Sequence, residues 1–203
     1  MPLWSHTHPG IFIDDSPSGF FAGCSADLNR IASGDLGKRF LGLLSKRTQG
    51  IGTKAGSNVV IMYTNKVSLT AQSSNEDGRE VRKDARPGSI VRLPAMGTGS
   101  VVRYGHNIES TYTTVCKIHM PPYIALSHEL VHAFHVISGD VVKEYDWGTD
   151  GAIIEEARTV GLGPYKNKTF TENAFRKEHN LVLRTYYSKS GDCDDLPSLT
   201  GVT

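Results

Sequence analysis

Two histidines and a glutamate in one apolar stretch have the residue types and spacing of a metal-dependent hydrolase. The stretch SHELVHAFHVISG contains His128, Glu129 and His132 in the order H-E-x-x-H. Helical residues four apart lie on the same face, so the two imidazoles can bind one metal ion. Glu129 lies near that face, where its carboxylate can handle a proton without binding the metal. The alternative is a buried helix whose histidines only form hydrogen bonds.

A catalytic zinc ion needs a third protein ligand and one open position. A metzincin would have glycine at position 135 and histidine at position 138, but this chain has His135 and Ser138. The later segment DGAIIEEARTVG offers Glu155 and Glu156 instead. Adjacent helical residues point about 100° apart, so one glutamate can bind the metal while the other supports a histidine by a hydrogen bond. Periodicity leaves open which does which, and an acidic solvent-facing helix is the alternative.

Peptide hydrolysis also needs donors where negative charge develops on the substrate oxygen. The segment LVLRTYYS supplies Arg184 with Tyr187 or Tyr186 close by. In a strand Arg184 and Tyr186 share a face, so Tyr187 requires a turn. A surface arginine beside core tyrosines is the alternative interpretation.

The elements that must position these groups are helices in the second half of the chain. The central helix begins after Pro121-Pro122, ends before Gly139 and is apolar around much of its circumference. A second helix is expected over 152–160, entered from Asp150 and stopped by Gly161. A third is expected over 172–178, with Thr169-x-x-Glu172 or Thr171 as its starting signal.

The first half is expected to provide two further helices and the strands. An apolar stripe over 25–45 predicts helix, and Gly34-Asp35 divides it into two. The stretch 58–65 is rich in β-branched residues and predicts a strand, which 67–71 continues as a hairpin. A short strand is expected over 89–93, within a long loop. The fold class is therefore α+β, with a small sheet packed on the central helix.

Composition limits the class of protein. The 203 residues suit one compact domain over 21–203, preceded by a flexible polar leader over 1–20. A net charge of +1 without an obvious basic cluster argues against a nucleic-acid partner, and no apolar run is long enough for a membrane span. The three cysteines, without a CxxC pair, favour a reducing compartment. We expect a monomer.

Together these motifs resemble the NleD-type family of zinc metalloprotease effectors, which pathogenic bacteria inject through type III secretion systems. The resemblance is carried by HELVHAFHVISG, EEARTVG, TENAFRKEH and LRTYY, and by the segment PGIFIDDSPSGFFAGCSADLNRIASGDLGKRF. The order of motifs is also similar to that of the clostridial neurotoxin light chains. The resemblance implies a zincin-like catalytic core holding one Zn²⁺ ion, and it covers nearly the whole chain.

The resemblance also implies roles for individual residues. His128, His132 and Glu155 are the expected zinc ligands, with Glu156 as a supporting residue. Glu129 is the expected catalytic base, and Arg184 with Tyr187 the pair that stabilises the transition state. The resemblance does not assign roles to His135, Asn173 and Arg176.

The family implies secretion into the host cytoplasm and cleavage of a host signalling protein. The implied substrates are stress-activated MAP kinases of the Jun N-terminal kinase class, cut in the activation loop to suppress inflammatory signalling. One alternative is the same chemistry on another host target, such as a membrane-fusion protein. Another is a non-catalytic effector that works by binding, with a structural zinc closed by a fourth ligand such as His135 or His119.

Overall fold

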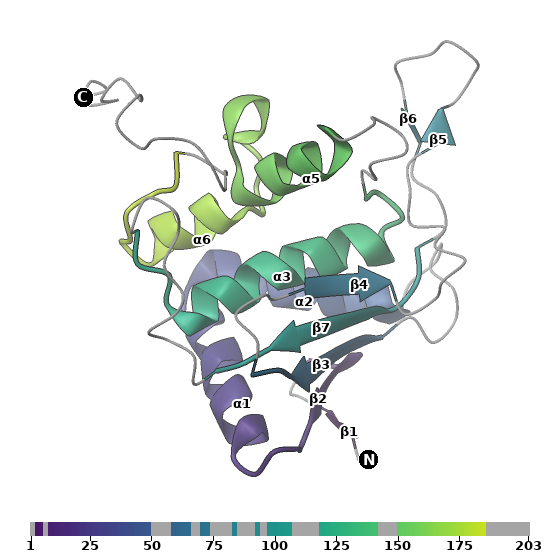
Figure 1. Ribbon diagram of the computed structural model, residues 1–203, viewed down its shortest axis with the longest axis vertical. Coiled ribbons are helices and arrows are strands. Elements are labelled where there is room, and N and C mark those ends of the chain that lie inside the picture. The colour runs from purple at the N-terminus through teal and green to yellow at the C-terminus, as the bar shows by residue number, and fades with distance from the viewer. Residues whose placement is uncertain are drawn as a thin grey trace.

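Helix α3 (Pro122–Ile137), which carries the H-E-x-x-H sequence, lies between a five-stranded sheet and helices α5 (Asp150–Val160) and α6 (Glu172–Glu178) in the computed structural model (Figure 1). The structure describes residues 3–5, 8–49, 58–65, 70–73, 83–84, 92–93, 97–106, 118–141 and 150–185. This arrangement confirms the expected α+β fold with a small sheet packed on the central helix.

The sheet has the strand order β1-β2-β3-β7-β4. Its strands are β1 (Leu3–Ser5), β2 (Ile11–Asp14), β3 (Val59–Tyr63), β7 (Ser100–Tyr104) and β4 (Thr70–Ser73). The three central strands run parallel, and β1 and β4 pair antiparallel at the two edges. A separate two-stranded piece consists of β5 (Lys83–Asp84) and β6 (Arg92–Leu93), the latter inside the range expected for a short strand.

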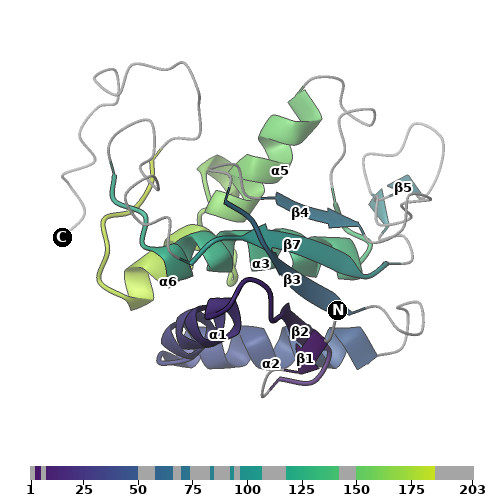
Figure 2. The ribbon, with the colours of Figure 1, turned by 60° about the horizontal axis from the view of Figure 1, so that its bottom comes forward.

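Alternating apolar residues explain why the central strands pack against helices. Ile11 and Ile13 of β2, and Val59 and Ile61 of β3, are fully buried, as the two-residue period of a strand requires. Helix α1 (Phe20–Ile31) packs on β2, and α3 packs on β4 and β7. Helix α2 (Asp35–Gln49) contacts α3 on another side and lies below β3, β7 and β4 in Figure 2.

The helices follow the sequence signals closely. Pro121 precedes the first turn of α3, where a missing backbone donor costs nothing, and Gly139 takes a positive φ of 65° just beyond its end. Gly161 likewise has φ 87° directly after α5. The Thr171 side chain accepts a hydrogen bond from the backbone of Ala174 and caps α6. None of the helices in the described part of the chain is long and apolar enough to cross a membrane.

Two expectations about the strands need correction. The hairpin expected from 58–65 and 67–71 does not form, because β4 pairs with β7, which lies between β3 and β4 in the sheet. The flexible leader expected over residues 1–20 does not extend through Ile11–Asp14, which form β2. Ile11 and Ile13 belong to the core, so burial of their side chains holds this segment in the sheet.

Candidate active site

Helix α3 presents one face of its middle turns to α5 and α6. Twelve of its sixteen residues are buried, so the helix is enclosed on most sides. His128 and His132 lie one turn apart on the face toward α5, as the four-residue spacing predicts. Their ring centroids are 4.8 Å apart. The histidine pair is therefore placed by a helix that is buried along most of its length.

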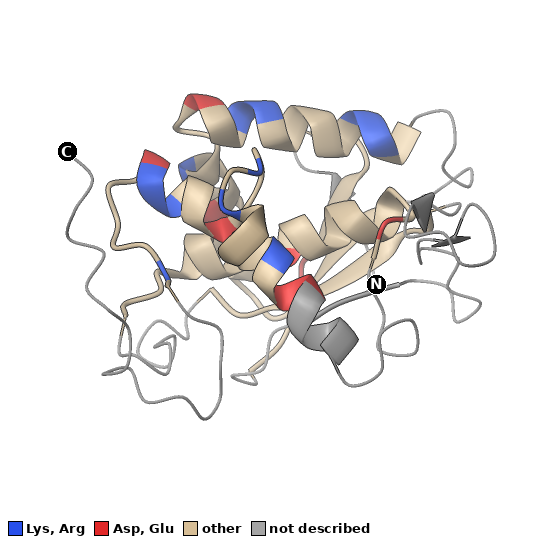
Figure 3. Cartoon of the chain, turned by 90° about the horizontal axis from the view of Figure 1, so that it is seen from above, with Lys and Arg blue, Asp and Glu red and all other residues tan. Residues whose placement is uncertain are grey.

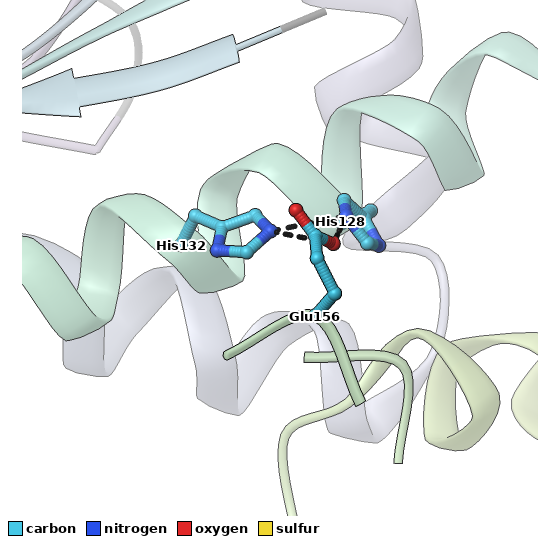
Figure 4. A group of neighbouring side chains, drawn as sticks. All are labelled: His128, His132 and Glu156. Atoms are coloured by element: carbon cyan, nitrogen blue, oxygen red, sulfur yellow. Dashed lines mark hydrogen bonds and ion pairs between the residues drawn. The ribbon is translucent and has the colours of Figure 1, made fainter. Parts of the chain in front are cut away.

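Three potential ligand atoms converge between α3 and α5 (Figure 4). His128 Nε2 and His132 Nε2 lie 3.1 Å apart. Glu156 Oε2 lies 3.1 Å from the first nitrogen and 3.2 Å from the second. The three residues come from two helices, and the Glu156 side chain reaches across to both rings. This convergence of two imidazoles and a carboxylate is the centre of the site.

The opposite nitrogens of both rings are held by other side chains. His128 Nδ1 lies 2.9 Å from Glu172 Oε2. His132 Nδ1 lies 3.3 Å from the Thr159 hydroxyl and 3.5 Å from Glu155 Oε1. A carboxylate beside Nδ1 favours a proton on that nitrogen, which leaves the Nε2 lone pair directed at the centre. Both histidines are therefore oriented as metal ligands.

Glu172 connects His128 to two arginines. Its side chain is fully buried on α6, and Oε1 accepts a hydrogen bond from Arg176 Nε at 2.6 Å. Oε2, which faces His128, also accepts one from Arg184 Nη1 at 2.7 Å. Arg176 is itself fully buried and donates to the carbonyl oxygens of His119 and Val182. A buried carboxylate needs such partners, because an unpaired charge in the interior is very costly.

Glu155 belongs to a second network behind His132. His135 Nδ1 lies 2.5 Å from Glu155 Oε1, and Arg158 Nη1 lies 3.4 Å from Oε2. The Arg158 guanidinium also donates to the Asp140 carboxylate and main-chain oxygen. Asp140 lies three residues beyond the end of α3, so these contacts attach α5 to the C-terminal end of α3 independently of any metal.

The positions of the two glutamates are therefore the reverse of those expected from the sequence. The resemblance implied Glu155 as the ligand and Glu156 as its support. In the structure Glu156 faces the two Nε2 atoms, whereas Glu155 contacts the Nδ1 atoms of His132 and His135. The physical reason is the 100° turn between neighbouring helical residues, which directs only one of them at the centre.

A comparison with protein-family models identifies the family of the chain. The family model Peptidase_M91, described as effector protein, matches residues 10–187 of the 203-residue chain. The chain belongs to the M91 effector family. It is therefore a metallopeptidase, as the H-E-x-x-H sequence predicted, and the resemblance to the effector proteases is confirmed.

Comparisons with other proteins add little to this family assignment. A solved structure with similarity to this M91 peptidase is the catalytic domain of Clostridium botulinum neurotoxin serotype F, at 18% identity and a TM-score of 0.47. The alignment covers 79% of this chain and 46% of that one, so this chain spans less than half of the neurotoxin domain. A sequence comparison with curated proteins finds no match.

The donor spacing fits a tetrahedral metal ion. Nitrogen and oxygen ligands about 2.0–2.2 Å from such an ion lie roughly 3.3–3.6 Å apart, slightly more than the 3.1–3.2 Å separations here. A second group, formed by His132, His135 and Glu155, fits less well. Its 2.5 Å contact between His135 and Glu155 is a hydrogen bond, and the adjacent Arg158 cation opposes a metal ion. The first group is therefore the better candidate for a metal site in this M91 peptidase.

Electrostatics around this first group keep its one carboxylate, Glu156, ionised. Burial opposes the charged form of Glu156, but hydrogen bonds from His128 and His132 lower the pKa of its carboxyl below the ordinary value. Burial opposes protonation of His128, yet hydrogen bonds to Glu156 and Glu172 raise its pKa to about 9. In the absence of metal, protons therefore take the place of the cation between these groups.

Glu129 lies in the same buried region without touching the centre. It is 7% exposed, and no hydrogen bond to its side chain is recorded among the described residues. Burial raises the pKa of the Glu129 carboxyl, while the charges of His128 and His132 act in the opposite direction. A carboxylate whose pKa lies above its ordinary value is suited to general base catalysis near neutral pH.

Of the expected oxyanion donors, Arg184 lies among the residues that the structure describes. Arg184 is buried and donates a hydrogen bond to Glu172, the residue that contacts His128. Tyr186 and Tyr187 lie outside the described residues. His119, one of the possible fourth ligands, is exposed, and its carbonyl oxygen contacts Arg176. His135, the other, contacts Glu155.

Sequence reasoning missed the role of Glu172 and the two residues that accompany it. Glu172 was interpreted only as a capping residue of α6. Glu172 and Arg176 are four residues apart, a spacing typical of solvent-facing ion pairs, so nothing in the pattern indicates burial. The side-chain amide of Asn173 holds the main chain of Arg184. Its Nδ2 donates to the Arg184 carbonyl oxygen at 2.7 Å, and its Oδ1 accepts from the Arg184 N–H at 2.8 Å. The segment TENAFRKEH, which contributes to the family resemblance, contains Glu172, Asn173 and Arg176. This resemblance is the sequence signal that points to them.

Proposed function

We propose that this M91 peptidase is a zinc endopeptidase whose metal ligands are His128, His132 and Glu156. The observation that supports the proposal most strongly is the convergence of two Nε2 atoms and one carboxylate oxygen, each ring being supported at Nδ1. Two imidazoles and one carboxylate form a common ligand set of catalytic zinc, which leaves a fourth position for water or substrate. Carboxylate partners at Nδ1 are also typical of zinc-binding histidines.

The reaction is hydrolysis of a peptide bond. When bound, zinc would lower the pKa of a water molecule and polarise the scissile carbonyl group. Glu129 takes a proton from the attacking water and passes it to the leaving amine. Arg184 and Tyr187 stabilise the negative charge on the former carbonyl oxygen. Glu172 and Glu155 hold His128 and His132 in the orientation that this chemistry requires.

A structural zinc closed by four protein ligands is the less favoured alternative. The fourth ligand would have to come from His135 or His119. His135 Nδ1 is 2.5 Å from Glu155, and His119 is an exposed residue beyond the N-terminus of α3. Because both are placed elsewhere, a coordination position remains for a reacting molecule.

For the substrate, we propose a host stress-activated MAP kinase of the Jun N-terminal kinase class, cut in its activation loop after delivery by a type III secretion system. Membership of an effector family supports a host protein as the target. The kinase and the secretion route rest on the resemblance of the sequence motifs. Loss of an intact activation loop would suppress inflammatory signalling.

The test is a cleavage assay with purified protein. Jun N-terminal kinase, p38 kinase and a membrane-fusion protein are incubated with the wild type, with and without a zinc chelator, and with Glu129→Gln. We expect fragments of the kinases only, with a cut in the activation loop that disappears with chelator and in the variant. Cleavage of the fusion protein alone would overturn the substrate. If enzyme with one bound zinc ion cleaves none of the three proteins, both the kinases and the fusion protein would be overturned as targets.

A further inference from the structure

A hollow between α2 and the segment leading into α6 is not used by the proposed chemistry. It has a volume of about 450 Å³. Its lining combines three cations with apolar groups, namely Lys38, Arg39, Lys46, Leu43, Gly42 and Phe170, together with Thr169. The α2 residues Arg39, Gly42, Leu43 and Lys46 follow the spacing of one helix face. This groove is therefore a continuous surface rather than a set of scattered side chains.

Basic charge is concentrated around this groove although the chain as a whole is nearly neutral. The segments 35–49 and 162–170 hold six of the 22 basic residues and one of the 21 acidic residues. Blue segments recur along α2 in Figure 3, and the sequence of this helix contains four basic residues and one acidic residue, Asp35. Lys38, Arg39 and Lys46 are exposed, and no ion pair is recorded for them among the described residues. Such a patch attracts a negatively charged partner.

Gly42 indicates that the groove is kept open. A glycine inside a helix destabilises it relative to alanine, and here close packing does not require one, because a Cβ at Gly42 would meet nothing within 4 Å. By contrast, a Cβ at Gly37 of the same helix would collide with the carbonyl oxygen of Ile31. The missing side chain at Gly42 therefore leaves space on the outer face of α2 rather than room for a neighbouring element.

The groove is connected to the active site through the start of α6. Thr169 and Phe170 lie just before Glu172, whose carboxylate contacts His128. The Phe170 ring packs on Phe40 of α2 and Phe134 of α3 at centroid distances of 5.3 and 6.3 Å. Phe134 on one side of α3 thus packs against a residue that lines the groove, whereas His128 and His132 on another side belong to the candidate metal site.

We propose that this groove docks an acidic segment of the substrate protein, with an apolar side chain seated over Gly42 between Leu43 and Phe170. The cations select negative charge, and the open glycine position accepts the apolar group. This inference rests on the proposed endopeptidase function. It adds a contact remote from the scissile bond, which would select whole proteins over short peptides.

Binding is tested first, without proteolysis. Glu129→Gln protein is titrated into a fluorescein-labelled peptide in which leucine and phenylalanine alternate with glutamates, and anisotropy is recorded at low and high salt. We expect saturable, salt-sensitive binding, weakened at least about tenfold by Lys38→Glu/Lys46→Glu or by Gly42→Phe. The matched control Arg103→Glu/Lys177→Glu makes the same charge change at exposed positions elsewhere and should bind normally. Equal loss in the control, or equal binding of anionic vesicles or an oligonucleotide, would overturn the proposal.

Cleavage is tested second. In otherwise wild-type protein, Lys38→Glu/Lys46→Glu should lower kcat/KM for the whole kinase at least about tenfold and leave a short peptide spanning the scissile bond unaffected. Equal effects on both substrates would overturn docking while leaving the peptidase intact. If no kinase is cleaved but the acidic peptide binds in the groove, the substrate proposal fails and the docking surface stands.

Discussion

His128 Nδ1 and Glu172 Oε2 lie 2.9 Å apart, and the same oxygen accepts a hydrogen bond from Arg184 Nη1 at 2.7 Å. One buried carboxylate therefore orients a histidine proposed to bind the metal and holds the cation proposed to stabilise the transition state. Replacing Glu172 should therefore impair both zinc binding and stabilisation of the transition state. Replacing His128 alone should impair the first, and replacing Arg184 alone the second.

Replacing Glu172 with glutamine should lower zinc affinity by roughly 10–100-fold, the usual effect of losing such a support, and reduce cleavage. The change keeps the volume of the side chain but removes the charge that favours Nδ1–H on His128. Competition with a zinc chelator measures the affinity. Glu178→Gln is the matched control, because Glu178 lies on the same helix but accepts hydrogen bonds from the backbone of Leu36 and Gly37. Unchanged zinc affinity in Glu172→Gln would contradict the orienting role.

The two adjacent glutamates should respond differently. Glu156→Gln should lose bound zinc at equimolar metal, because it removes a ligand. Glu155→Gln should retain the metal with weaker affinity, because Glu155 contacts the Nδ1 atoms of His132 and His135 rather than the Nε2 atoms at the centre. Zinc content after gel filtration separates the two cases. Zinc loss confined to Glu155→Gln would restore the assignment expected from the sequence.

The metal-free protein should lose stability as the pH falls from about 4.5 towards 2. Burial opposes ionisation of Glu172, but the hydrogen bond from His128 and the charges of Arg184 and Arg176 lower its pKa to about 2. A lowered folded-state pKa means that the stabilisation is complete above the unfolded value near 4.5 and disappears as the carboxylate is protonated. The shift corresponds to roughly 3 kcal/mol.

Urea titrations of the metal-free wild type and Glu172→Gln between pH 6 and pH 2 measure this contribution. The free energy of unfolding should fall more steeply with decreasing pH in the wild type. Parallel curves for the two proteins would show that Glu172 is not the group responsible.

Tyr187→Phe should lower kcat and kcat/KM together by about 10²–10³ with little change in KM, as expected for a donor used only in the transition state. Tyr186→Phe is the matched control and should stay near wild-type activity. Steady-state kinetics on one peptide substrate compare them. The opposite result would shift the donor to Tyr186, and full activity in both would leave Arg184 and the metal as the stabilising groups.

Gly42→Ala should stabilise the protein by about 0.5–1 kcal/mol, because alanine favours helix and the position is open. Thermal or urea unfolding of zinc-loaded protein measures this change. Gly37→Ala is the contrasting variant on the same helix and should destabilise, because its Cβ would meet the Ile31 carbonyl. If both alanine variants were more stable than the wild type, the helix would have to relax around the new side chain at Gly37.

The sequence predicted helices better than strand pairing. The bounds of α6 and the glycine after α5 follow from local capping and left-handed backbone, which depend on neighbouring residues. The position of β4 beside β7 depends on contacts between segments distant in sequence, and a strand pattern does not specify its partner.

The site shows the same division between local and long-range information. His128 and His132 come together because one helix fixes their spacing. The choice between Glu155 and Glu156 depends on how α5 is rotated against α3, which Arg158 and Asp140 help to fix. Glu172 and Arg184 reach the site through burial of a charged cluster that no local pattern indicates.

Asn173 gives the C-terminal part of the site an unusual attachment. Its side-chain amide donates to the carbonyl and accepts from the N–H of residue 184, the same pair of bonds that a neighbouring strand would provide. An active-site cation is thus carried by a segment that needs no sheet or helix of its own. Arg176 adds a second attachment of this segment to α6 through the Val182 carbonyl. Substitutions that keep both contacts should therefore leave the position of Arg184 unchanged.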